Sequence, residues 1–178
     1  MPKTKINAMH RTTYVELSDI LEIAAYKNEP PFILILDGLE DPRNFGAILR
    51  TAEAVGVHGV IIPNRRSVSV NETVEKTSTG ASKIVPIVQV SNITDVMAKL
   101  KKENIWIYGL DMDAQKTYTE IDYKGPVALV VGSEGKGVSR IVKEHCDDLI
   151  KLPMRGKIES LNVSVAAGIA MYEVLKTR

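Results

Sequence analysis

Short runs of consecutive apolar residues alternate along this chain with segments whose apolar residues recur every three or four positions. The run Phe32–Leu36 is apolar at every position, which is typical of a strand buried on both faces of a parallel sheet. Five further runs repeat this pattern, at 59–62, 84–88, 105–108, 127–131 and 148–152. We therefore predict six strands.

Helical patterns fill the stretches between these runs, and we expect helices over 45–55, 72–78, 93–102, 138–145 and 161–175. The alternation predicts an α/β fold, with a mostly parallel six-stranded sheet flanked by helices. The first part of the chain differs, since 18–27 predicts a short amphipathic helix and 1–13 is typical of a tail or linker. We divide the chain into an N-terminal segment, 1–31, and a domain, 32–178.

The overall charge of the chain indicates no particular partner. Its 178 residues are 44% hydrophobic, enough for one domain with a sizeable core, and 23 basic residues balance 22 acidic ones to a net charge of +1. Any RNA contact must therefore come from a local basic face. Six residues are candidates for it, with ordinary solubility as the alternative: Arg43, Arg65, Arg66, Lys136, Arg140 and Arg155.

Three features predict a cytoplasmic protein. The single cysteine, Cys146, excludes an intrachain disulfide and fits a reducing compartment. The longest apolar runs, such as 165–171, are far shorter than the roughly 18 residues of a membrane span. The N-terminus leads into polar residues rather than into the apolar region of a signal peptide.

The loops that follow the strands are the places to search for a binding site, because ligands of open α/β sheets bind at the carboxyl ends of the strands. After the first strand come Asp41 and Asn44, which suit a turn and a helix cap, and Arg50 in the helix that follows. After the fifth strand comes 132–137, whose three glycines allow a ligand to approach the backbone closely.

This glycine-rich loop matches neither common phosphate motif. Val130 and Gly137 stand where a Walker loop needs glycine and serine or threonine. Arg140 replaces the third small residue of a dinucleotide fingerprint, and Glu134 would repel a phosphate. The loop is compatible with a nucleoside held by backbone groups.

Hydrolase and metal chemistry are not indicated. The nearest approach to a serine nucleophile, Gly132-Ser133-Glu134, lacks the Gly-x-Ser-x-Gly pattern. Metal-ligand spacing is absent from the histidines and the cysteine, which are His10, His58, His145 and Cys146. We expect no metal.

Polar side chains interrupt the small apolar residues near the C-terminus, in the stretch 159–168. Ser and Asn favour helix starts over helix interiors, and buried polar groups need hydrogen-bond partners. This stretch therefore predicts a helix N-terminus packed into the core, with its polar groups directed at a partner that the stretch does not identify. The alternative is that Ser160 or Asn162 acts only as a helix cap.

Three motifs, in this order, resemble the SpoU branch of the SPOUT RNA methyltransferases. Asp41-Pro42-Arg43-Asn44 with Arg50 carries the first, 132–135 the second and 160–166 the third. The resemblance runs from Phe32 to the C-terminus and is strongest to bacterial enzymes that methylate a guanosine ribose in 23S ribosomal RNA. It implies transfer of a methyl group from S-adenosylmethionine to a ribose 2′-hydroxyl.

The resemblance also implies features that the apolar pattern does not reveal. It implies that the sheet carries a deep C-terminal trefoil knot and that two chains form a homodimer through the last helix, whose small and apolar residues suit close packing. Backbone groups would hold the cofactor at five positions, which are Leu110, Gly132, Ile150, Leu152 and Leu161.

By the same resemblance, five residues take catalytic roles: Asn44, Arg50, Glu134, Ser160 and Asn162. The family assigns the residue matching Arg50 to activation of the 2′-hydroxyl. A guanidinium keeps its proton in proteins, so we expect Arg50 to orient the RNA and stabilise the developing alkoxide, with general base catalysis as the alternative. Asn44, Glu134 and Asn162 would position Arg50 and the substrate, with Ser160 beside them.

The N-terminal segment departs from the family pattern. Relatives usually carry a separate RNA-binding domain there, whereas 31 residues precede the first predicted strand. We interpret the chain as a truncated or a naturally minimal enzyme that binds RNA weakly on its own. Two alternatives follow: a tRNA 2′-O-methyltransferase, or a cofactor- or RNA-binding module without turnover.

Overall fold

The described strands form one large parallel sheet and one small antiparallel pair. The computed structural model describes residues 5–7 and 12–178. Strands β3 to β9 form a seven-stranded parallel sheet in the order β5-β4-β3-β8-β6-β9-β7, and β1 pairs with β2 antiparallel. The strands are β1 Lys5–Asn7, β2 Thr12–Tyr14, β3 Phe32–Asp37, β4 Gly59–Pro63, β5 Ile87–Val90, β6 Trp106–Leu110, β7 Lys116–Thr117, β8 Val127–Gly132 and β9 Asp148–Lys151.

Strands β1 and β2 were not predicted, since they lie at 5–7 and 12–14, in and next to the predicted tail. All six predicted strands are present, but the large sheet has one strand more than predicted. The seventh, β7, has two residues and pairs with β9, which makes it too short to produce an apolar pattern. The strand expected at 84–88 begins only at Ile87, because a 3-10 turn over Ala81–Lys83 precedes it and leaves Ile84 exposed. Part of the predicted tail, 1–4 and 8–11, lies outside the described residues.

The predicted helices are also present; α3 and α4 start where predicted, and the other four start one to three residues away from the prediction. They are α1 Leu17–Tyr26, α2 Pro42–Val55, α3 Glu72–Thr77, α4 Ile93–Lys102, α5 Arg140–His145 and α6 Val163–Lys176. Helix α2 begins earlier than expected because Pro42 suits a first helical turn and the Asp41 side chain accepts the Arg43 N–H (2.8 Å). No helix among the described residues has the length and apolar character needed to cross a bilayer.

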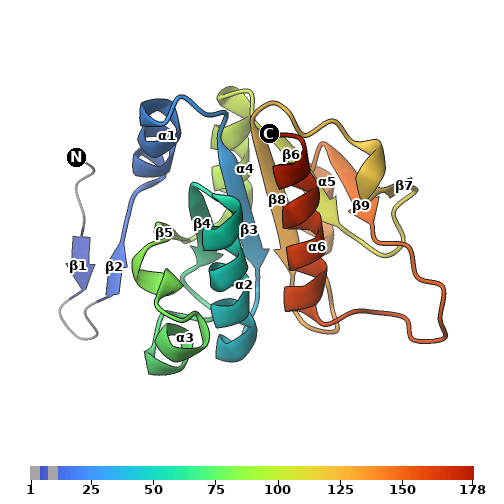
Figure 1. The fold of residues 1–178 in the computed structure, drawn as a ribbon, viewed down its shortest axis with the longest axis horizontal. Coiled ribbons are helices and arrows are strands. Elements are labelled where there is room, and N and C mark those ends of the chain that lie inside the picture. The colour runs from blue at the N-terminus through green and yellow to red at the C-terminus, as the bar shows by residue number, and fades with distance from the viewer. Residues whose placement is uncertain (1–4, 8–11) are drawn as a thin grey trace.

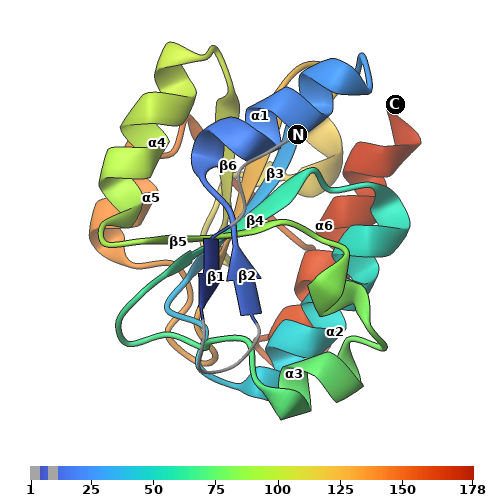
Figure 2. The same ribbon diagram turned by 90° about the vertical axis from the view of Figure 1, so that its left-hand side faces the viewer.

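Helices cover both faces of the large sheet (Figures 1 and 2). Helices α2 and α6 lie on one face, and α4 and α5 lie on the other. Leu34 of β3 is buried with Leu49 and Met171 in the α2–α6 layer, whereas its neighbour Ile33 is buried with Met97 in the α4 layer. Because alternate side chains enter two different cores, β3 is apolar at every position.

The adjacent strands β4, β3 and β8 end at the same level. Asp37 at the end of β3 pairs with Gly132 at the end of β8, and β3 pairs in register with β4 from Ile33 to Ile35. These carboxyl ends point to the lower edge of the sheet in Figure 1, where α2 and α6 begin. The loops after β3 and β8, where a binding site was predicted, therefore meet at one edge.

His58 joins the amino end of β3 to the turn before β4. Its N–H donates to the Phe32 carbonyl (2.8 Å), and the Phe32 N–H donates back to His58 Nδ1 (2.9 Å). Nε2 of the same ring donates to the Glu29 carboxylate (2.8 Å). Burial lowers the pKa of His58, with Glu29 acting in the opposite direction, and the resulting neutral ring can accept the Phe32 N–H.

His58→Leu is expected to lower the free energy of unfolding by about 1–3 kcal/mol, because the buried Phe32 N–H loses its acceptor. The lowered pKa of His58 also predicts a pH dependence. As the pH falls below about 6.5, the unfolded chain binds a proton that the folded chain does not, so the native protein loses stability down to the folded pKa. Urea unfolding between about pH 7.5 and about pH 5.5 measures both effects.

The control for this experiment is His145→Gln, which changes a histidine that is only partly buried. The His58→Leu variant should show a smaller loss of stability on acidification than the native protein and the control. An equal loss in all three proteins would contradict the role of His58.

Candidate functional site

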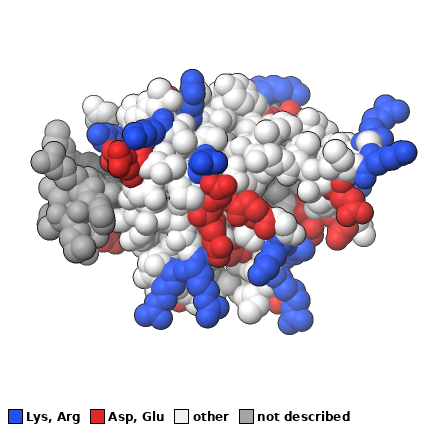
Figure 3. Space-filling view, turned by 90° about the horizontal axis from the view of Figure 1, so that it is seen from below, with Lys and Arg blue, Asp and Glu red and all other residues white. Residues whose placement is uncertain are grey.

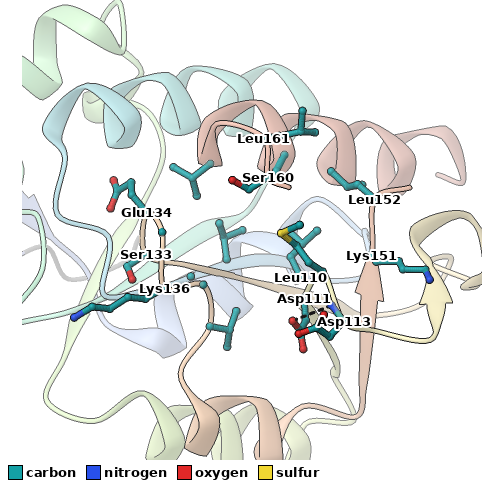
Figure 4. Close-up of a pocket in the computed structure, with 18 of the residues that line it drawn as sticks. Leu110, Asp111, Asp113, Ser133, Glu134, Lys136, Lys151, Leu152, Ser160 and Leu161 are labelled. Carbon is teal, nitrogen blue, oxygen red and sulfur yellow. Dashed lines mark hydrogen bonds between the residues drawn. The ribbon is translucent and has the colours of Figure 1, made fainter. Parts of the chain in front are cut away.

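A cavity of ≈ 420 Å³ opens at the carboxyl ends of β6, β8 and β9. Its walls come from the loops after these three strands and from the first turn of α6 (Figure 4). All five residues predicted to bind the cofactor line it, namely Leu110, Gly132, Ile150, Leu152 and Leu161. The structure therefore brings together residues that are up to 51 positions apart in the chain, from Leu110 to Leu161.

The glycine-rich loop after β8 forms a tight turn at one side of the cavity. Ser133 and Gly137 exchange two backbone hydrogen bonds (3.2 and 2.9 Å) across it. Gly135 and Gly137 adopt positive φ angles of 78° and 69°, which glycine tolerates without strain. A Cβ atom on Gly132 would lie 1.9 Å from the Gly137 carbonyl carbon. Only glycine at position 132 therefore leaves room for the loop to fold back on itself.

Three of the five predicted catalytic side chains form one hydrogen-bonded network. Glu134 Oε1 accepts the Asn44 side-chain N–H (3.2 Å) and the Asp41 backbone N–H (3.3 Å). Asn44 Oδ1 in turn accepts from Asn162 Nδ2 (3.2 Å). The network joins the loop after β8 to the N-termini of α2 and α6, and it fixes which way both amide groups point.

Asn162 also caps α6. Its side-chain oxygen accepts the N–H groups of Ser164 (2.9 Å) and Val165 (3.4 Å), while its nitrogen donates to Asn44. The helix-cap interpretation is therefore confirmed for Asn162. One side chain serves both the helix end and the network.

The prediction that this stretch packs into the core was wrong. Glu159, Ser160, Leu161 and Asn162 are exposed, and α6 begins at Val163, two residues later than expected. The polar groups belong to the loop before the helix, where water can satisfy them at little cost. Burial of α6 starts further along, at Ala167.

Arg50 and Ser160 lie outside the network. Ser160 lines the cavity, and within the described chain its hydroxyl has no hydrogen-bond partner. Arg50 is exposed on α2 and does not line the cavity, and no described residue pairs with its guanidinium. Within the described chain, Arg50 thus forms no hydrogen bond with the residues that were expected to position it.

Sequence reasoning missed an ion pair in the cavity wall. Lys143 Nζ of α5 lies 3.1 Å from Asp111 Oδ2, and the Asp111 side chain is only 14% exposed. Asp111 Oδ1 also accepts the Asp113 N–H (3.3 Å), so the residue shapes the turn after β6. Figure 4 shows Asp111 and Asp113 on the side of the cavity opposite Glu134. The position of Asp111 directly after a predicted strand was the available signal.

Two titratable groups, the Cys146 thiol and the Tyr108 hydroxyl, are held neutral by burial. Burial raises the pKa of the Cys146 thiol to about 12, and Asp147 and Asp37 add to the shift. The pKa of Tyr108 is also raised, mainly by burial and further by the negative charges of the nearby Asp147, Asp148 and Asp122. Neither group is available as an anionic nucleophile near neutral pH. In the described part of the chain, no group of three or more His, Cys, Asp or Glu side chains could hold a metal ion.

Known proteins resemble this chain over most of its length. A family model described as "SpoU rRNA Methylase family" matches residues 31–172. YacO of Bacillus subtilis (strain 168), named for the TrmH family of tRNA/rRNA methyltransferases, is 53% identical over 93% of this chain and 66% of its own length. The 23S rRNA (guanosine-2′-O-)-methyltransferase RlmB of Pseudomonas aeruginosa is 47% identical over 83% of this chain and 60% of its own length.

A solved structure shares the fold. The SpoU methyltransferase AviRb from Streptomyces viridochromogenes, in complex with the cofactor AdoMet, has a TM-score of 0.78 and 28% identity, covering 83% of this chain and 58% of that one. The chain thus spans about two thirds or less of these relatives. The family match covers the sheet, the cavity and the network, and the chain belongs to the SpoU rRNA methylase family.

Proposed function

We propose that this protein transfers a methyl group from S-adenosylmethionine to the ribose 2′-hydroxyl of a guanosine in 23S ribosomal RNA. The observation that carries this proposal is the Glu134–Asn44–Asn162 network at the wall of the cavity. It unites side chains from all three motifs that resemble the SpoU enzymes. The RlmB relative, at 47% identity, bears the name of this reaction.

The chemistry of the cavity fits S-adenosylmethionine. Leu110, Leu152 and Leu161 supply apolar surface, and the exposed segment 153–161 makes no backbone hydrogen bond within the described chain. Its free N–H and C=O groups are suited to the edge of a nucleobase and to ribose hydroxyls. Backbone groups of the five predicted positions would hold the cofactor, at Leu110, Gly132, Ile150, Leu152 and Leu161.

When bound, S-adenosylmethionine would supply its sulfonium methyl group to the ribose 2′-oxygen: the C–S bond would break as the C–O bond forms, S-adenosylhomocysteine would leave, and the hydroxyl proton would pass to water. The protein contributes by holding the nucleophile in near-attack geometry. Asn44, Glu134 and Asn162 would orient the ribose, with Ser160 beside them. The positive charge of Arg50 would contact the RNA from outside the cavity and stabilise negative charge on the 2′-oxygen.

Two features of the chain's organisation belong to the same proposal. Residues 32–178 would form the catalytic domain, with 1–31 leading into it, a division supported by the family match over 31–172. The C-terminal part would form the trefoil knot of SPOUT enzymes. The return of α6 from the β9 side of the sheet to pack against α2 supports it. Methylation of ribosomal RNA would take place in the cytoplasm.

A groove between α2 and α6 is the proposed surface of a homodimer. Ala47 and Thr51 of α2 line it together with Val165, Ile169 and Tyr172 of α6. These three α6 side chains are large, apolar and exposed, and a contiguous apolar surface of this kind marks an interaction site. In such a dimer, Arg50 would lie at the border of the interface.

Transfer of labelled methyl from S-adenosylmethionine to undermethylated ribosomal and transfer RNA, followed by mapping of the modified ribose, tests the proposal. We expect a guanosine of 23S rRNA to be labelled. Transfer to tRNA alone would favour the tRNA enzyme, since the YacO name covers both substrates. Cofactor binding without transfer to either RNA would favour the binding module.

In the same assay, Arg50→Ala should abolish transfer and leave the dissociation constant for S-adenosylmethionine largely unchanged, because Arg50 does not line the cavity. Calorimetric titration measures the cofactor affinity. Arg50→Lys keeps the positive charge but loses the planar guanidinium with its fixed hydrogen-bond donors. Partial activity of the Arg50→Lys variant would support electrostatic stabilisation. An equal loss of cofactor binding in Arg50→Ala would contradict the assigned role.

Asn162→Asp separates the two roles of Asn162. The carboxylate keeps an oxygen that caps α6, so stability should change little, but the N–H that donates to Asn44 is lost. We expect transfer to fall about 10- to 100-fold through misplacement of the network. The control is Asn92→Asp, which changes a capping residue of α4 outside the site. Full activity in Asn162→Asp would mean that Asn162 is a cap only.

Ile169→Asp combined with Tyr172→Asp should convert the protein from a dimer to a monomer, because two charges would have to be buried in the interface. Light scattering coupled to gel filtration measures the mass. Tyr26→Asp, at a side chain that is 93% exposed on α1, is the matched control and should stay dimeric. A monomeric native protein, or a dimeric double variant, would contradict the proposed interface.

A further inference from the structure

The loop between β4 and α3 carries two adjacent arginines that the network does not use. Arg65 and Arg66 follow the end of β4 and are both exposed. Among the described residues, neither guanidinium has a hydrogen-bond or ion-pair partner. Two unpaired cations on consecutive residues form a concentrated positive charge in a chain whose net charge is +1.

This arginine turn, Arg65–Arg66, lies at the same edge of the sheet as the cavity. Strands β4 and β8 flank β3, and their registers with β3 bring the ends of all three to one level. Adjacent strands are about 4.8 Å apart, so the end of β4 lies about 10 Å from the end of β8. Figure 2 shows the chain between β4 and α3 leaving the lower end of the sheet, where α2 begins.

Hydrogen bonds on both sides hold the arginine turn in place. The Asn64 N–H donates to the Val90 carbonyl (2.9 Å), and the Val68 N–H donates to the Leu39 carbonyl (2.7 Å). Val68 is buried, which anchors the far side of the turn in the core. The cations are therefore presented on a fixed backbone, and little conformational freedom is lost when a ligand binds them.

Arg66 also has an unusual backbone conformation. Its φ angle of 51° lies in the left-handed region, which disfavours residues that carry a side chain. A glycine would adopt this conformation more readily. An arginine thus stands at a position where the backbone alone would favour glycine, and such backbone strain clusters at binding sites.

We propose that Arg65 and Arg66 bind backbone phosphates of the RNA strand beside the nucleotide that is methylated. This proposal rests on the proposed function and names how that substrate is held. An arginine guanidinium can donate two parallel hydrogen bonds to the oxygens of one phosphate. Such phosphate contacts position a nucleic acid without reading its sequence. Figure 3, which views the carboxyl edge of the sheet, shows acidic side chains near the middle and basic ones around them. The basic side chains around the site, and not its acidic middle, would therefore hold the RNA backbone.

Arg65→Ala combined with Arg66→Gly tests the proposal, with an undermethylated 23S rRNA fragment as the probe. Glycine at 66 keeps the left-handed backbone available. We expect the dissociation constant for RNA to rise about tenfold. The slope of log affinity against log salt concentration should become shallower by about 1 to 2. The affinity for S-adenosylmethionine and the unfolding midpoint should not fall.

Lys101→Ala combined with Lys102→Ala is the matched control, since it removes two adjacent exposed cations at the end of α4, before the amino end of β6. This control should keep its RNA affinity. Equal losses in both double variants, or unchanged RNA affinity and salt slope in the arginine variant, would overturn the proposal. A native protein that binds RNA but neither binds S-adenosylmethionine nor transfers methyl would instead contradict the proposed function alone.

Discussion

The parallel pairing of β3 with β8 is the constraint on which the site depends. Phe32–Asp37 and Val127–Gly132 pair over their whole length, so two loops that are far apart in the chain begin side by side. Only this register brings Glu134, two residues beyond β8, to the start of α2. A slip by one residue would also exchange the two buried faces of β3, so the packing of both helix layers enforces the geometry of the site.

Once the loops meet, polar side chains join them. The contacts of Asn44 with Glu134 and with Asn162 span 90 and 118 positions of sequence. Each amide uses its oxygen and its nitrogen for different partners, which leaves one orientation for the pair. The Asn44–Asn162 hydrogen bond also joins the start of α6 to the start of α2. Helix packing and the alignment of the reacting groups therefore depend on the same few atoms.

The site divides its polar groups into paired and unpaired sets. The Asp111–Lys143 pair and the network have partners within the protein, and they give the cavity a fixed shape. Arg50, Arg65 and Arg66 have no described partner and are exposed, where a charge costs little to maintain. Satisfied groups thus build the walls, and unsatisfied cations are available to a polyanion that approaches from outside.

Local pattern by itself determined the six longer strands and the helices, because burial on both faces of a strand and helical periodicity are visible in neighbouring residues. It limited the cap of the last helix to Ser160 or Asn162 without deciding between them. The resemblance to SpoU enzymes added the motif residues but not their arrangement. Tertiary structure alone decided that Glu134, Asn44 and Asn162 touch, that Arg50 is separate, that β7 extends the sheet and that Asp111 pairs with Lys143. These features rest on contacts between distant residues, and such contacts follow from strand order and register, which periodicity along a single chain does not specify.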